Sequence, residues 1–216
     1  MVLSVCMGVL LLTASIAAPI LCRPFYYAHI DAMHLTEITP WSREEIQQAY
    51  DEMLDFCLGK GEFSTGVMAW TDWGKAHFED VKVLFLLDLR VMGISLAVLV
   101  CLLAAARLTG RRPRPILNHG PGFWTGTGLA AVFLMIGGLA ALDFQRAFVV
   151  FHTVFFPGKE NWILDYHDDQ IINVLPSEFF RNCAILILML LILGCVVLVA
   201  GDLIYQKKCC GSEEMK

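Results

Sequence analysis

Two histidines, His77 and His152, each lie beside a long apolar stretch of the chain. Asp80 follows His77 by three residues, so the two side chains would share one face of a helix. An imidazole with a reference pKa of about 6.5 can take up or release a proton near neutral pH. The spacing therefore favours general acid–base chemistry, and it fits equally well two histidines that merely tolerate a polar–apolar boundary.

Charged residues also lie inside the apolar stretches beside the two histidines: Lys82, Asp88, Arg90, Asp143 and Arg146. A charge within an apolar span is costly, so it is normally paired or functional. We expect Asp88 or Arg90 to pair with Asp143 or Arg146. An ion pair that joins two helices is as consistent with the sequence as a direct part of these residues in catalysis.

The composition identifies the environment of these residues. Of the 216 residues, 57% are hydrophobic and 17% are charged, against about 25% charged in soluble domains. Four apolar blocks are each long enough to cross a membrane, which takes roughly 20 residues. The composition excludes a disordered chain and a fibrous repeat, and the net charge of −5 argues against nucleic-acid binding. An integral membrane protein remains.

We therefore predict an all-α membrane protein, a bundle of four transmembrane helices with a small, mainly helical extracytoplasmic domain. Arginines between the second and third spans and Lys207 and Lys208 after the fourth predict that both termini are cytoplasmic. The predicted segments are transmembrane helix 1 (1–21), the extracytoplasmic domain (22–80), transmembrane helix 2 (81–106), a basic cytoplasmic loop (107–121), transmembrane helix 3 (122–151), an extracytoplasmic loop (152–180), transmembrane helix 4 (181–205) and a cytoplasmic tail (206–216). The arginines of the basic loop are Arg107, Arg111, Arg112 and Arg114.

Local patterns predict further elements. Ser42 and Glu45 form a capping-box sequence, and the apolar residues after them recur at helical spacing, which predicts an amphipathic helix over 43–58. The stretch 62–73 is rich in aromatic and turn residues and could form a short hairpin. Five glycines of the third span would suit close helix packing in lipid: Gly122, Gly126, Gly128, Gly137 and Gly138.

No nucleotide-binding loop, serine-hydrolase elbow or metalloprotease motif is present in the sequence. His167, Asp168 and Asp169 could suggest a metal site, but three consecutive side chains cannot easily share one ion. We predict neither a metal nor a cofactor.

Several motifs resemble the bacterial lipoprotein intramolecular transacylase (Lit) family. They are the runs HFEDVK (77–82) and FHTVFF (151–156), the stretch 50–58, and Trp162, Asp165, Asp169, Leu175, Pro176 and residues 178–180. Phe78 stands where the family would have methionine. The resemblance spans nearly the whole chain and includes four spans with both termini inside.

The resemblance implies an enzyme of the bacterial plasma membrane, with its active site facing the outer leaflet. Its reaction would move the sn-2 acyl chain of a diacylglyceryl-cysteine lipoprotein to the α-amino group of that cysteine, leaving a lyso-form lipoprotein. Lipoproteins and membrane lipids would be its partners. His77 and His152 would act as acid and base in one outward-open cleft. Asp80 could fix the tautomer of His77, and Arg90 or Arg146 could hold an oxyanion.

Two other classes stay open on the sequence alone. A four-span adhesion or scaffold protein has the same layout, although the first outer loop here lacks the paired cysteines of that class. A small transporter would also place charges in its spans, although it would normally have more helices or an internal repeat.

Overall fold

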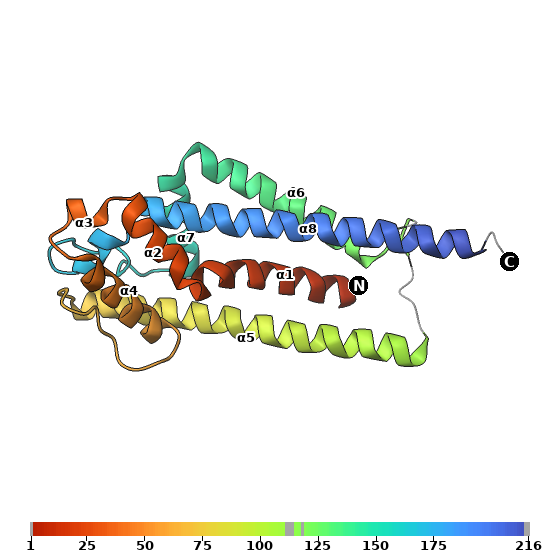
Figure 1. The fold of residues 1–216 in the computed structure, drawn as a ribbon, viewed down its shortest axis with the longest axis horizontal. Coiled ribbons are helices and arrows are strands. Elements are labelled where there is room, and N and C mark those ends of the chain that lie inside the picture. Colours follow the sequence, from red (N-terminus) through yellow and green to blue (C-terminus); the bar gives the residue numbers. More distant parts are fainter. Residues whose placement is uncertain (1, 111–114, 118, 214–216) are drawn as a thin grey trace. The chain divides into compact units, whose positions relative to one another are not determined.

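The computed structural model describes residues 2–110, 115–117 and 119–213, and Figure 1 shows its helices. They are α1 (Val2–Leu21), α2 (Arg23–Ala32), α3 (Leu35–Ile38), α4 (Arg43–Cys57), α5 (Asp72–Thr109), α6 (Pro121–Leu142), α7 (Phe144–Phe155), the 3-10 helix η1 (Gln170–Val174) and α8 (Ser177–Glu213). No β-strand occurs within the described ranges. Arg111, Arg112 and Arg114 of the predicted basic loop lie outside them.

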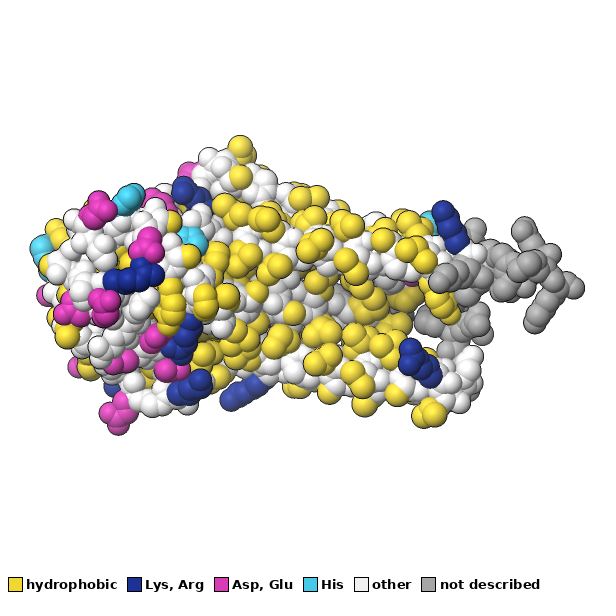
Figure 2. Space-filling view, in the orientation of Figure 1, with side chains coloured by type: hydrophobic (Ala, Val, Ile, Leu, Met, Phe, Trp, Pro, Cys, Tyr) yellow, Lys and Arg dark blue, Asp and Glu magenta, His cyan; other side chains and the backbone are white. Residues whose placement is uncertain are grey.

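Four of these helices are long and apolar enough to cross a membrane: α1, α5, α6 and the first 31 residues of α8. Each of them overlaps one of the four predicted apolar blocks. Figure 2 shows hydrophobic side chains over the long helices, whereas acidic side chains gather over the region of α2 to α4. The predicted all-α architecture with four candidate spans is therefore confirmed.

The third predicted span is two helices rather than one continuous helix over 122–151. The backbone of Asp143 is extended, with φ −155° and ψ 92°, and separates α6 from α7. The Asp143 carboxylate accepts a hydrogen bond of 2.9 Å from the amide of Arg146, which caps the first turn of α7. Asp143, which was expected inside one long helix, thus caps the start of α7.

By its internal contacts the chain divides into two compact units. The first comprises residues 1–16, 89–138 and 186–216. Here α6 packs closely on α8, because a methyl group built on Gly126 would lie 2.7 Å from the carbonyl oxygen of Cys195. Gly122 and Gly137 approach α8 as closely. Gly128 and Gly138 have no such neighbour within 4 Å among the described residues, so close packing is confirmed for three of the five glycines.

The second unit comprises residues 17–88 and 139–185 and contains the predicted amphipathic helix. Ser42 and Glu45 form the expected capping box: the Ser42 hydroxyl accepts from the Glu45 amide at 3.2 Å, and Glu45 accepts from the Ser42 amide at 2.8 Å. The apolar face of α4 is buried, and its Tyr50 ring stacks on Tyr26 of α2 at 3.7 Å. The helix prediction for 43–58 is confirmed.

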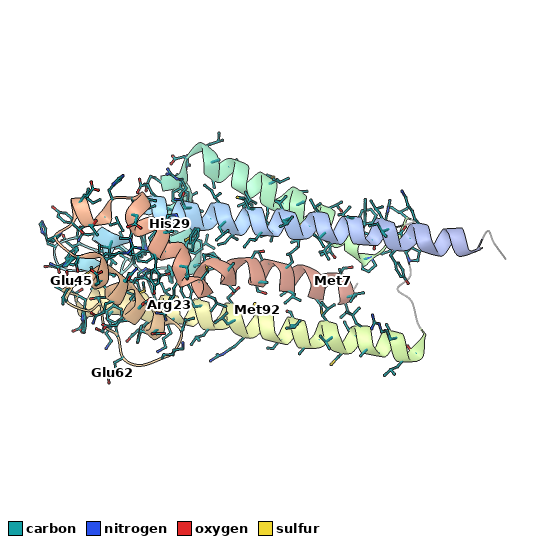
Figure 3. All side chains as sticks on the ribbon, in the orientation of Figure 1. Met7, Arg23, His29, Glu45, Glu62 and Met92 are labelled. Atoms are coloured by element: carbon teal, nitrogen blue, oxygen red, sulfur yellow. The ribbon has the colours of Figure 1, made fainter. Side chains whose placement is uncertain are left out.

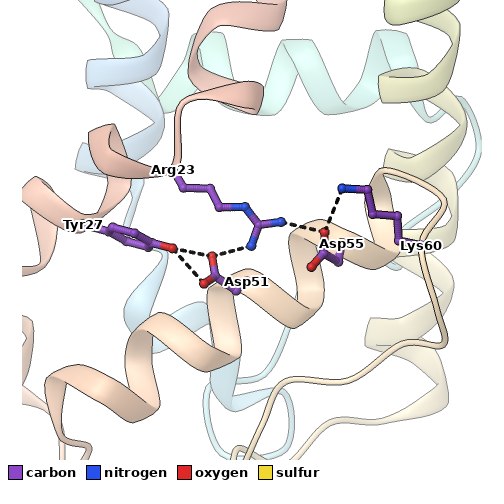
Figure 4. Close-up of polar contacts among 5 residues, drawn as sticks. All are labelled: Arg23, Tyr27, Asp51, Asp55 and Lys60. Atoms are coloured by element: carbon purple, nitrogen blue, oxygen red, sulfur yellow. Dashed lines mark hydrogen bonds and ion pairs between the residues drawn. The ribbon is translucent and has the colours of Figure 1, made fainter.

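An ionic contact also joins α2 to α4 (Figure 4). The Arg23 guanidinium lies between the carboxylates of Asp51 and Asp55, at 2.6 Å from each. Tyr27 donates its hydroxyl hydrogen to Asp51, and Lys60 lies 3.5 Å from Asp55. One arginine thus bridges two acidic side chains one helical turn apart, which fixes the start of α2 on the surface of α4.

The predicted hairpin over 62–73 is wrong. These residues form turns, and α5 already begins at Asp72. The amide of Gly66 donates to the Glu52 carboxylate of α4 at 2.9 Å, and Ser64 donates to the same carboxylate. The polar groups of the segment are therefore bonded to a helix side chain instead of to a paired strand.

Candidate active site

The second unit brings His77 and His152 together. His77 lies in the second turn of α5, before the apolar part of that helix, and His152 lies in the last turn of α7. Their ring centroids are 5.9 Å apart and the rings are inclined by 35°. Residues 75 positions apart in sequence thus share one site, as their common depth predicts.

Aromatic rings surround the two imidazoles. Phe156 lies 5.2 Å from His77 and 5.7 Å from His152, and the rings of Trp162 and Phe148 lie 4.7 and 4.2 Å from His152. The two histidines are only 8% and 7% exposed. The prediction of a wide, outward-open cleft is therefore not met in this structure, because the aromatic side chains cover both rings.

Hydrogen bonding assigns the tautomer of His152. Its Nδ1 lies 2.8 Å from the carbonyl oxygen of Phe148. A carbonyl only accepts, so Nδ1 carries the hydrogen, and the Nε2 of a neutral His152 carries the lone pair. Burial lowers the pKa of His152, and the bond to Phe148 partly offsets that effect.

His77 has a different environment. Its Nδ1 is buried and has no hydrogen-bond partner in the part of the chain that the structure describes. Burial, reinforced by the neighbouring His152 and opposed by Asp80, lowers the pKa of His77 to about 4. The imidazole of His77 is therefore neutral near pH 7.

Asp80 does not fix the tautomer of His77 in this structure. Its carboxylate accepts hydrogen bonds from Lys159 and from the Asn161 amide, the latter at 3.0 Å. Burial alone would raise the pKa of Asp80, but these hydrogen bonds outweigh it and the pKa is lowered. The sequence pattern missed Lys159 and Asn161, because nothing in their spacing links them to a residue about 80 positions earlier.

The other supporting residues are dispersed. The ammonium of Lys82 lies over the Phe56 ring, 4.1 Å from its centroid, so it packs on α4. Asp88, on α5, makes no ion pair with Arg146 within the described second unit.

The predicted pair of Asp88 with Arg146 is thus not found among the described residues of this unit, and Asp143 caps α7. Arg146 is exposed, and Arg90 belongs to the first unit. Within the described second unit, no ion pair gives Arg146 a part in the site.

A third histidine of this unit provides a comparison (Figure 3). His29, on α2, bonds through Nδ1 to the carbonyl oxygen of Phe25 at 2.6 Å and through Nε2 to the amide of Asn182 at 3.1 Å. Both ring nitrogens of His29 are therefore occupied. It packs and bonds as a structural histidine, whereas His77 and His152 keep nitrogens available for chemistry.

A pocket of about 310 Å³ lies between the first turns of α5 and the segment after α7, and neither His77 nor His152 lines it. It is lined by Trp73, Ala76, Gly158, Lys159, Glu160 and Asn161. Within the described ranges, no group of three or more His, Cys, Asp or Glu side chains is arranged to hold a metal ion. What the site offers chemically is a pair of imidazoles among aromatic rings.

The chain resembles one protein family and several solved structures. The sequence matches the family described as lipoprotein intramolecular transacylase Lit over residues 1–180. Among solved structures, the membrane-integral lipoprotein intramolecular transacylase Lit from Bacillus cereus is similar over 100% of this chain and 95% of its own, with a TM-score of 0.84 and 22% identity.

Two further structures of the Bacillus cereus protein carry a substitution of one histidine. The arginine variant has a TM-score of 0.78 at 20% identity and covers 99% of this chain and 91% of its own. The alanine variant has a TM-score of 0.76 at 21% identity and covers 100% and 93%. At such identities these likenesses establish the fold. No curated protein matches the sequence significantly.

Proposed function

The chain belongs to the family of lipoprotein intramolecular transacylases, and we propose that it moves the sn-2 acyl chain of a diacylglyceryl cysteine to the α-amino group of the same cysteine. It is an acyltransferase of the bacterial membrane, from a family that acts on lipoproteins. The proposed product is an N-acylated lipoprotein that keeps a lyso-glyceryl group. The observation that carries the proposal is the imidazole pair at 5.9 Å.

The proposed reaction needs one proton transfer and no further reactant. The amine nitrogen attacks the ester carbonyl, so that an N–C bond forms and the C–O bond to the sn-2 oxygen breaks. One proton moves from the nitrogen to the departing oxygen. Because amine and ester belong to one molecule, they are already close, and no covalent enzyme intermediate is required.

The two histidines fit different parts of this transfer. His152 has its lone pair on Nε2, so it takes the proton from the attacking amine. As an imidazolium it then acts as an acid and hands the proton on to the departing oxygen. His77 is neutral, so it donates an N–H hydrogen bond to oxygen as negative charge develops there. His152 thus acts as base and then as acid while His77 stabilises the negative charge, and no metal or serine nucleophile is needed.

The aromatic surroundings suit a lipid substrate. Phe148, Phe156 and Trp162 provide an apolar wall for the acyl chain next to the imidazoles. Both histidines adjoin the apolar parts of the chain, which supports an active site at the level of lipid head groups. The acidic loops on this side lie outside under the positive-inside rule, so we assign the site to the outer leaflet.

A crossover experiment tests the proposed function. Purified protein is incubated with two synthetic diacylglyceryl lipopeptides, of which one carries deuterated acyl chains and the other a different peptide. The proposed transfer is an isomerisation, so the mass of each lipopeptide stays constant while its free amine disappears. Tandem mass spectrometry should then find on each peptide an N-terminal fragment that bears the peptide's own acyl chain.

Two outcomes contradict the proposal. One is persistence of the free amines with an intact, folded protein. The other is an exchange of deuterated chains between the two peptides, which would show that the transfer is intermolecular. The His34→Ala variant is the matched positive control, because the exposed side chain of His34 bonds only to Glu37 among the described residues.

A further inference from the structure

The segment between α7 and α8, residues 156–176, contacts α5 on both sides of His77. One contact, described above, is the bond between Asn161 and Asp80, three residues after His77. The other lies before His77, where Asp169 and Gln170 meet the residues that lead into α5. The histidine is thus held between two attachments of one segment.

The earlier attachment centres on the Asp169 carboxylate. Asp169 is 3% exposed and accepts hydrogen bonds from the amide of Thr71 at 2.8 Å and from its hydroxyl at 2.9 Å. The Thr71 hydroxyl in turn accepts from the amide of Gly74 at 3.0 Å. Asp169 therefore orients the side chain that caps the first turn of α5.

Neighbouring contacts leave Asp169 little freedom. Gln170 exchanges two hydrogen bonds with the backbone of Ala69, at 2.8 and 3.0 Å. A methyl group built on Gly74 would overlap the Asp169 carboxylate. Position 74 thus requires glycine, because the buried Asp169 carboxylate, which Thr71 holds in place, lies so close to it.

We propose that Asp169 is a positioning residue that sets the place of His77 relative to His152 through Thr71 and the first turn of α5. This inference rests on the proposed function of the histidine pair. Gly74 precedes His77 by three residues, so a shift of the first turn moves the imidazole with it. Asp169 acts on the reaction only through this helix, and it contributes no proton.

Substitution of Asp169 tests the proposal in the lipopeptide assay. Asp169→Ala should lower kcat by about 10²-fold with little change in KM, because small misplacements of a catalytic group are that costly. Asp169→Asn keeps an oxygen for the Thr71 amide and an NH₂ group for its hydroxyl, so it should restore kcat to within about threefold of wild type. Asp168→Ala, an exposed carboxylate of the same segment, is the control and should leave kcat unchanged.

A second variant covers a possible failure of Asp169→Ala to fold. Gly74→Ala displaces the carboxylate from the opposite side and should lower kcat similarly. Because both changes act on one contact, the double variant should lose no more than the worse single variant. Additive losses would contradict the proposal.

NMR of ¹⁵N-labelled histidines separates positioning from general destabilisation. The His77 ring signals should shift in Gly74→Ala or Asp169→Ala and return in Asp169→Asn. Unchanged kcat per folded molecule with unchanged His77 signals would overturn the inference. Absence of acyl transfer by the wild-type protein would instead overturn the proposed function.

Discussion

His29, His77 and His152 all pack among aromatic rings, yet they differ in how their ring nitrogens are used. Both nitrogens of His29 are hydrogen-bonded, whereas His152 bonds through Nδ1 alone and the Nδ1 of His77 has no partner among the described residues. An unpartnered buried nitrogen costs free energy, because it loses its hydrogen bonds to water without gaining others. At the scale of the residue, this free bonding capacity separates the proposed catalytic pair from His29.

The buried, neutral state of His77 predicts a dependence of stability on pH. In the folded protein its pKa is about 4, whereas in the unfolded chain it is near 6.5. Between these values the unfolded chain binds the extra proton, so the free energy of unfolding falls as the pH drops from about 6.5 to about 4. His77→Phe, which keeps an aromatic ring, should lose less stability over this interval.

Thermal unfolding in detergent at several pH values measures this difference. His34→Ala should follow the wild type, because His34 is exposed. If the unfolding temperatures of wild type and His77→Phe fell in parallel below pH 6.5, His77 would not be the buried neutral group described here.

At the scale of the element, the glycines of α6 allow a matched comparison. Gly126→Ala should destabilise the packing of α6 on α8 by about 1–3 kcal/mol, since the added methyl group meets the rigid backbone carbonyl of Cys195. Gly128→Ala adds the same methyl group where the described structure has no neighbour within 4 Å. It should be neutral or stabilising by up to about 1 kcal/mol through helix propensity.

Thermal unfolding of the two variants in the same detergent provides the measurement. Equal unfolding temperatures for Gly126→Ala and Gly128→Ala would contradict close packing at Gly126. The comparison needs no activity assay, so it tests the fold independently of the proposed chemistry.

Elements were predictable where the signal is local. The capping box and the helical spacing of 43–58 predicted α4, and apolar length predicted the spans. The break at Asp143 was not predicted, because an aspartate inside an apolar run reads equally as a buried charge and as a helix cap. The early start of α5 was missed as well, since its capping by Thr71 depends on Asp169, 98 residues later.

The residues of the candidate site could be predicted only in part from the sequence. The common depth of His77 and His152 beside apolar stretches placed them together correctly. Asn161 and Lys159 were missed because they join the site only through the folded segment after α7. An ion pair of Asp88 with Arg146 was expected from the cost of a buried charge alone, but none forms among the described residues of the second unit, and Asp143 caps α7.

At the scale of the whole molecule, the positive charges predict the orientation in the membrane. Arg107 and its neighbours, together with Lys207 and Lys208, should lie in the cytoplasm. A reporter that is active only in the cytoplasm should therefore work when it is fused after Lys208. A reporter inserted after Lys60, in the acidic region, should function only outside. A reporter after Lys208 that proved to be outside would reverse the orientation and the leaflet assigned to the site.

The measurement that tests the central claim most directly is the initial rate of acyl transfer to the cysteine amine in histidine variants of equal amount and fold. His152→Ala should lower the rate by about 10²–10⁴-fold, the usual contribution of acid–base catalysis. His77→Ala should lower it by about 10²–10³-fold, the usual cost of removing a donor to the developing oxyanion. His34→Ala and His119→Ala should keep the wild-type rate. Full activity in a well-folded double variant of His77→Ala and His152→Ala would contradict the account.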